Sequence, residues 1–320
     1  MTLDARFTAY PSLRPQSPED FAILFEILET ELAAEIAGDR EKLIQPLALL
    51  GVRHLAGHTG LRCIIRGETG TGKTTVAKAL ALQLGAPFCR ISAGEMAETT
   101  WRGADLTNHI DALRRGLLGT KVTMSSATAL ACRSIVLIDD LDVLRLQPFE
   151  SYSDSDRGQR AGRQASLAGL WSGEDILVNE GEWTWSTAGV LVIGAGAFEG
   201  VEHPIDSASL TQWGLATSLA ERLASGTIIQ MEPLPLADLC AVALREAEQL
   251  VAPAFQAFGY ELTISAAAAH HAAGYARARD ESAGVRSVVG VLRRAADRLL
   301  IRLVTSAKPG ARVTLAPDDL

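Results

Sequence analysis

The chain has 320 residues, of which 48% are hydrophobic and 21% charged, an ordinary composition for a globular protein, and its length favours two domains. The formal net charge is −8. Because phosphate contacts need clustered Lys and Arg, this acidity argues against a nucleic-acid partner. The four cysteines are far apart and form no CxxC pair, which argues against a structural zinc site, and we expect Cys63 and Cys132 to be buried thiols.

No apolar stretch approaches the roughly 20 residues that a membrane-spanning helix needs. The N-terminal residues also lack the apolar region of a signal peptide. We therefore expect a cytoplasmic protein with no membrane partner.

Residues 1–18 contain three prolines and are predicted to form an extended or loose arm. A helix is predicted over 17–38, with Ser17 as its cap, Pro18 at its first position and Gly38 at its end. Its apolar face needs a cover, either the main domain or another protein; the face consists of Phe21, Leu24, Phe25, Leu28, Leu32 and Ile36. A second helix is predicted over 39–56.

From residue 61 the chain alternates short apolar runs with helical patterns, which predicts an α/β fold with a parallel sheet covered by helices. The helices are predicted at 72–85 and within 104–118. The predicted strands are LRCIIRG (61–67), APFCRISA (86–93), SIVLIDD (134–140) and GVLVIGAG (189–196).

The remaining segments predict a loop, one more strand and a helical end. Residues 150–165 are polar and rich in Gly and Ser, which predicts a mobile loop. In EWTWS (182–186) a strand would place both tryptophans on one face, where core or hairpin packing is expected. From about residue 234 a small, mostly helical domain is predicted, with helices at 236–252, 265–280 and 284–305 and a short strand in RVTLAP. The predicted domains are thus 1–38, 39–233 and 234–320.

The strongest motif is GETGTGKTT, which fits the phosphate-binding pattern G-x-x-x-x-G-K-[ST] between a predicted strand and a predicted helix. Backbone amides and the helix N-terminus would hold phosphate oxygens. Lys73 is expected to reach the β- and γ-phosphates of ATP, and Thr74 to bind Mg²⁺. The predicted nucleotide-binding residues of this loop are Gly67, Glu68, Thr69, Gly70, Thr71, Gly72, Lys73, Thr74 and Thr75.

Two acidic residues follow the apolar run SIVLI, as expected for a buried parallel strand that ends at a site. Asp139 is predicted to help hold Mg²⁺, through water. Asp140 stands where a general base would stand, although nucleotide hydrolases usually have Glu there. Asp is one methylene shorter, so Asp140 either acts as the base of a slowed reaction or only caps a turn.

These motifs together resemble the AAA+ ATPases, and within them the ClpX-type protein unfoldases. The resemblance covers roughly residues 36–305. Besides the phosphate-binding loop, it rests on IAGDREK (36–42), IDDLDVL (138–144), VLVIGAGAFEGVE (190–202), SLTQWGLATSLAERLASGTIIQMEPL (209–234) and AGVRSVVGVLRRAADRLL (283–300).

The resemblance implies further roles. Ile36 stands in the segment that contacts adenine in the family. Arg222 stands at the arginine finger, which reaches the γ-phosphate bound by a neighbouring subunit. Trp101 and Arg102 stand at the pore loop that grips a polypeptide substrate. A homo-oligomer, most often a hexamer, and an ATP-driven chaperone activity on protein substrates are implied with them.

Three departures from the family accompany these matches. The arginine that senses nucleotide in the family is replaced by Ala283, which leaves Arg286 and the nearby Arg279 as the two candidate substitutes. The loop with the tripeptide I-G-F is missing, so no ClpP partnership is expected. The zinc domain of the family is missing as well, and residues 1–38 are expected to choose a partner or substrate instead.

The sequence therefore predicts an ATP- and Mg²⁺-dependent hydrolase that remodels or unfolds proteins. A nucleotide-gated assembly or scaffold protein with weak hydrolysis is the first alternative, because Asp140 and Ala283 both favour it. A DNA-associated motor or loader is the second. The pair His270–His271 predicts no metal site, because adjacent residues on a helix point apart.

Overall fold

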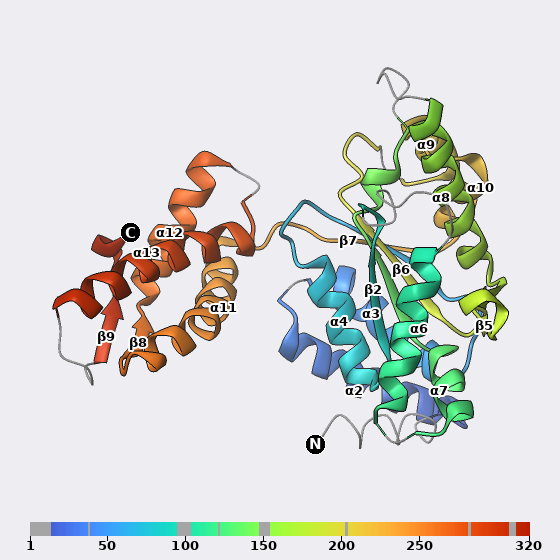
Figure 1. Cartoon of the computed structure of the whole chain (residues 1–320), viewed down its shortest axis with the longest axis horizontal. Helices are drawn as coiled ribbons and strands as arrows, with labels where there is room; N and C mark the ends of the chain where they lie inside the picture. The colour runs from blue at the N-terminus through green and yellow to red at the C-terminus, as the bar shows by residue number, and fades with distance from the viewer. Residues whose placement is uncertain are drawn as a thin grey trace. The chain divides into compact units, whose positions relative to one another are not determined.

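A computed structural model describes residues 14–37, 39–94, 104–120, 122–146, 154–201, 204–280, 283–306 and 312–320. The chain divides into two compact units. The first unit holds the residues up to Gly67 together with Lys73–Met231, and the second holds Glu68–Gly72 and Glu232–Leu320 (Figure 1). No helix within these described ranges is both long and apolar enough to cross a bilayer.

The first unit is built on a five-stranded parallel sheet with the order β2-β3-β6-β1-β7. The strands are β1 (Arg62–Arg66), β2 (Phe88–Ser92), β3 (Ile135–Asp139), β6 (Leu191–Gly196) and β7 (Thr227–Gln230). The four predicted strands and their parallel arrangement are confirmed. The edge strand β7 was not predicted, because four residues are too few to set an apolar period apart from its surroundings.

Helices α2 (Pro18–Glu35), α3 (Gln45–Leu55) and α4 (Lys73–Leu84) cover one face of the sheet. A π-helical turn, Arg40–Ile44, leads into α3. Strand residues such as Cys63, Ile65 and Leu137 point into this layer. Their sequence neighbours Ile64, Val136 and Ile138 point into the opposite layer. This alternation buries the strands on both faces, as parallel sheets require.

The predicted N-terminal helix forms as α2, and Ser17 caps it by accepting a hydrogen bond of 3.0 Å from the backbone N–H of Asp20. The helix ends at Glu35, earlier than predicted, and Gly38 lies outside the described residues. Leu28, Leu32 and Ile36 are buried in the layer formed with α3 and α4. The main body of the same chain therefore covers the apolar face of this helix.

The opposite layer contains α6 (Ala104–Leu118), α7 (Met124–Ala131), α8 (Asp154–Ser172), α9 (Ser207–Trp213) and α10 (Thr217–Ala224). The loop predicted over 150–165 is wrong for its described part, because α8 begins at Asp154. Leu167 and Trp171 anchor this helix in the apolar layer. The buried Gln164 donates a hydrogen bond of 2.8 Å to the carbonyl of Leu144. These tertiary contacts override the polar composition of the segment.

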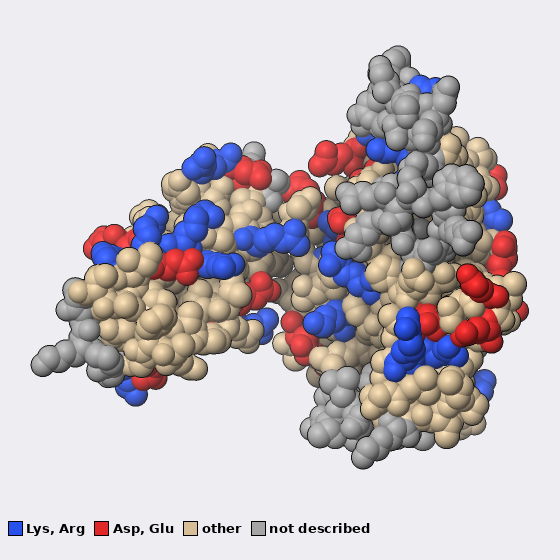
Figure 2. Space-filling model, in the orientation of Figure 1, with Lys and Arg blue, Asp and Glu red and all other residues tan. Residues whose placement is uncertain are grey.

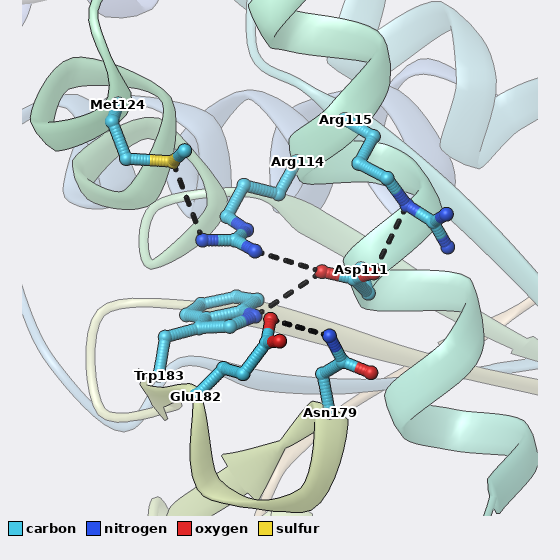
Figure 3. A network of polar contacts seen from close by, with 7 residues as sticks. All are labelled: Asp111, Arg114, Arg115, Met124, Asn179, Glu182 and Trp183. Carbon is cyan, nitrogen blue, oxygen red and sulfur yellow. Dashed lines mark hydrogen bonds and ion pairs between the residues drawn. The ribbon is translucent and has the colours of Figure 1, made fainter.

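A hairpin of β4 (Asp175–Val178) and β5 (Trp183–Ser186) lies against α6 through a polar network (Figure 3). The buried carboxylate of Asp111 binds Arg114 at 3.0 Å, Arg115 at 2.9 Å and the indole N–H of Trp183 at 3.3 Å. The Arg114 guanidinium also stacks 4.6 Å from the centre of the Trp183 ring. Trp183 and Trp185 are both buried, so the predicted packing role of the two tryptophans is confirmed.

Of the two cysteines predicted to be buried, Cys63 is fully so and Cys132 only in part. Burial raises the pKa of both thiols, which keeps them protonated at neutral pH. They therefore act as small apolar side chains in the core.

His54 in α3 makes the stability of the first unit depend on pH. Its ring lies in the core, and Nε2 contacts the carbonyl of Arg133 at 3.0 Å. Burial lowers the pKa of His54 from 6.5 to about 4, against the opposing effect of the contact with the Arg133 carbonyl. At a pH between these two pKa values, His54 is protonated in the unfolded chain and neutral in the folded chain. Stability due to neutral His54 is therefore present above pH 6.5 and is lost as the pH falls toward 4.

The pH prediction is tested with His54→Gln, which removes the titrating group and keeps a hydrogen-bonding side chain. Between pH 7 and pH 5 the wild type should lose about 2 kcal/mol more of its free energy of unfolding than the variant does. Urea titrations at both pH values measure this difference. Equal losses in the two proteins would contradict the account.

The second unit is mostly helical, as predicted for the C-terminal part of the chain. It contains α11 (Leu236–Ala257), α12 (Ala266–Arg279) and α13 (Val285–Ser306), with the short parallel strands β8 (Glu261–Ile264) and β9 (Arg312–Leu315). Buried alanines of α12 share one apolar core with residues of α11 and α13. Strand β9 was predicted from RVTLAP, whereas β8 was not.

Candidate functional site

The predicted phosphate-binding loop connects the end of β1 to the first turn of α4. Gly70 and Gly72 adopt φ values of +88° and +95°, which only glycine adopts without strain. Inside the loop, the Thr71 hydroxyl donates a hydrogen bond of 2.9 Å to the carbonyl of Glu68. Gly70 and Gly72 are therefore required by the turn of the backbone itself.

Lys73 and Thr74 open helix α4 beside the end of the sheet. The Lys73 ammonium donates a hydrogen bond of 2.6 Å to the carbonyl of Gly67. Gly67 in turn donates its N–H to the carbonyl of Gly196, 3.1 Å away at the end of β6. The lysine is thus held at the carboxyl ends of the central strands, where open α/β sheets bind their ligands.

Asp139, the last residue of β3, joins this group from the neighbouring part of the sheet. The residue is only 4% exposed, and its carboxylate accepts a hydrogen bond of 2.7 Å from the Thr74 hydroxyl. Its other oxygen accepts a hydrogen bond from the backbone N–H of Asp140 at 3.2 Å. A hydroxyl and a carboxylate in contact are oxygen donors of the kind that Mg²⁺ prefers, so the residues fit this ion.

Arg90 is part of the same cluster and was not predicted. It lies on β2, and its guanidinium pairs with the Asp139 oxygen that also binds Thr74, at 2.9 Å. The sequence marks Arg90 as a candidate only because it is a charged residue inside the apolar strand FCRIS. Finding its partner needed the register of β2 against β3, which the sequence does not reveal.

Asp140 lies at the surface, where the protein shields its carboxyl only in part, and has a left-handed backbone, with φ 58° and ψ 45°. Asp tolerates this conformation better than most residues. Partial burial of the carboxyl, followed by the negative charge of Asp139, raises the pKa of Asp140 against the opposing charges of Arg90 and Lys73. A raised pKa brings a carboxylate nearer to the basicity that a general base needs at neutral pH.

Asp142 is a further residue that the sequence reasoning missed. Its two oxygens accept hydrogen bonds of 2.7 Å from the backbone N–H groups of Ala197 and Phe198. The contact ties the turn after β3 to the turn after β6. A Cβ atom at Gly196 would lie 2.8 Å from the Asp142 carboxylate, so only glycine fits there. In the sequence, Asp142 is marked as a candidate only by its being the third acidic residue of IDDLD.

The other predicted residues lie apart from this cluster or outside the described chain. Trp101 and Arg102 are among the residues that the structure does not describe. Ile36 is buried in the apolar layer of the first unit. Arg222 lies in α10, where it contacts the Ser172 hydroxyl and donates a hydrogen bond of 2.7 Å to the carbonyl of Ser218. Arg286 is exposed in the first turn of α13.

The glycine-rich loop lies between the parallel strand β1 and helix α4. Asp139 ends β3, which is separated from β1 in the sheet by one strand, β6. This arrangement defines the class of P-loop nucleotide-binding folds. Residues 63–208 match the family described as ATPase family associated with various cellular activities (AAA). This part of the chain therefore matches an AAA ATPase domain. The predicted fold class, an α/β P-loop AAA+ domain followed by a mostly helical C-terminal region, is confirmed.

Proposed function

We propose that the protein is an ATP-dependent remodelling or unfolding ATPase of the ClpX-like kind, which acts on protein substrates as a homohexameric ring and without ClpP. The observation that carries the nucleotide part is the contact of 2.7 Å between Thr74 and the buried Asp139 beside the glycine-rich loop. The protein-remodelling part rests on the resemblance of the chain and on Trp101 and Arg102.

Each residue of the candidate site has its own role in ATP hydrolysis. Mg²⁺ would be held by Thr74 and, through water, by Asp139, and when bound it neutralises charge on the transferred phosphoryl group. Lys73 places a positive charge beside the same phosphates. Asp140 orients the attacking water and accepts its proton.

Arg222 belongs to the assembly part of the proposal. In the ring it reaches the γ-phosphate bound by a neighbouring copy and stabilises the developing charge. Its hydrogen bonds to Ser172 and Ser218 would have to open or adjust for this reach. The resemblance assigns nucleotide contacts to Ile36 and Arg286, although Ile36 is buried in the apolar layer of the first unit. Residues 1–38 contribute to the choice of partner. The domain limits 39–233 and 234–320 stay a prediction.

A second function, a nucleotide-gated assembly or scaffold protein, is favoured by one specific feature. Asp140 has a shorter side chain than the usual Glu and already lies in a tight left-handed turn. A base that stands roughly an ångström too far back slows hydrolysis without preventing ATP binding.

The deciding measurement is steady-state ATP hydrolysis by the purified protein with Mg²⁺, with Lys73→Ala as the blank. We expect turnover clearly above that blank and a further increase when unfolded proteins are added. Turnover equal to the blank, with ATP still bound in an equilibrium assay, would contradict the motor and leave the scaffold function.

A further inference from the structure

Two helices, one in each unit, carry charges of opposite sign. Helix α2 contains six acidic residues and no basic one. Helix α13 contains five arginines and a single acid, Asp297. Figure 2 shows that Lys and Arg side chains of the C-terminal unit gather over α12 and α13. Each helix also exposes large apolar side chains among its charged residues, a combination that is typical of interaction surfaces.

The exposed face of α2 combines acidic and apolar residues. Ile23 and Ile27, one turn apart, are 55% and 49% exposed. Glu19, Glu26 and Glu31 surround them at helical spacing and are exposed as well. The core-facing side of the same helix is already packed against α3 and α4. This outer stripe, Glu19–Glu31, is therefore left uncovered by the described part of its own unit.

The exposed face of α13 combines basic and apolar residues in the same way. Ile301 and Val304 are 66% and 49% exposed. Arg294 and Arg298 precede Ile301 by two turns and one turn, and both are exposed. Arg298 donates a hydrogen bond of 2.8 Å to the carbonyl of Leu320, which holds its guanidinium on this side of the helix. The opposite side of α13 is packed in the core of the second unit.

We propose that the acidic outer stripe of α2 in one copy docks against the basic stripe of α13, residues Arg294–Val304, in a second copy. The inference rests on the homo-oligomer of the proposed function and names its surface. Each stripe is about 15–18 Å long at 1.5 Å per residue, so the two match in length. Apolar pairs then meet at the centre while carboxylates face guanidinium groups around them.

A second copy is the partner that the charges favour. Every copy carries one acidic and one basic stripe, so the two surfaces are present in equal number without any other protein. When two copies share a single contact of this kind, the contact is heterologous and leaves one stripe of each kind free at the ends of any open chain. Contacts of this type close into rings or extend into filaments.

The test compares two charge-reversed proteins by light scattering after gel filtration. Protein A carries Glu26→Arg and Glu31→Arg, and protein B carries Arg294→Glu and Arg298→Glu. We expect the wild type to assemble, with weaker assembly in 0.5 M salt. A and B alone should each need at least about tenfold higher concentration to assemble. Mixed together they should reassemble, because basic α13 of A meets acidic α2 of B and the reversed pair is complementary too.

Matched controls separate this inference from the proposed function. Glu180→Arg with Glu182→Arg changes the charge by the same amount on the β4–β5 hairpin and should leave assembly unchanged. Binding of a fluorescent ADP analogue reports folding of A and B independently of assembly. A wild type that stays monomeric would overturn both the inference and the ring. Normal assembly of A and B, or a mixture that fails to reassemble, would overturn the inference alone.

Discussion

Replacing Asp140 by asparagine is expected to lower steady-state ATP turnover by about 100-fold or more while nucleotide affinity stays within about twofold of the wild type. Asparagine has the same shape but cannot accept the proton of the attacking water. It also tolerates the left-handed backbone of this position, so the turn after β3 is preserved. A coupled ATPase assay measures the turnover, and titration with a fluorescent ATP analogue measures the binding.

The glutamate variant of the same position supplies the complementary measurement. Asp140→Glu moves the carboxylate roughly an ångström toward the nucleotide. If the shorter side chain limits the wild type, turnover should increase by as much as roughly 100-fold. Equal turnover in the wild type, the asparagine variant and the glutamate variant would show that Asp140 only shapes the turn. The nucleotide-gated scaffold would then be the better description.

Local patterns were sufficient to predict the elements that build the site. The apolar runs at 61–67 and 134–140 and the glycines of the loop each carry their signal within a few residues. Thr74 and Asp139 were predicted to share Mg²⁺, and the structure brings their oxygens to 2.7 Å from each other. The two residues meet because parallel strands present their carboxyl ends at one edge of the sheet, and their role in Mg²⁺ binding stays a prediction.

Features that depend on distant parts of the chain were not predictable in this way. Arg90 meets Asp139 only through the register of two strands. The polar composition of α8 predicts a loop, whereas the helix is stabilised by contacts with residues far along the chain. Arg62 has no distinguishing feature in the sequence. In the structure it is buried and donates hydrogen bonds to several segments of the chain.

Replacing Arg62 by methionine is expected to lower the free energy of unfolding of the first unit by about 3–5 kcal/mol. The guanidinium is buried in β1 and donates hydrogen bonds to backbone carbonyls only. The distances are 2.9 Å to Trp171, 3.2 Å to Leu170, 2.8 Å to Leu61, 2.8 Å to Val190 and 3.5 Å to Thr187.

These carbonyls explain the expected size of the effect. Leu170 and Trp171 belong to the last turn of α8, whose final carbonyls have no partner inside the helix. The others lie at the start of β1 and before β6. Burial lowers the pKa of Arg62 from 12.5 to about 10, so the side chain stays charged at neutral pH. Methionine fills a similar volume but leaves the carbonyls without donors in a site that admits little water.

Urea denaturation followed by tryptophan fluorescence measures this loss, because every tryptophan of the chain precedes residue 232 and reports on the first unit. Arg157→Met on the exposed side of α8 is the matched control and should change stability by less than about 0.5 kcal/mol. Arg62→Lys keeps the charge but cannot span all five carbonyls, so it should fall between the control and the methionine variant. If Arg62→Met were as stable as the control, water would have to donate the hydrogen bonds to the last carbonyls of α8. The buried arginine would then not be what holds that helix to the sheet.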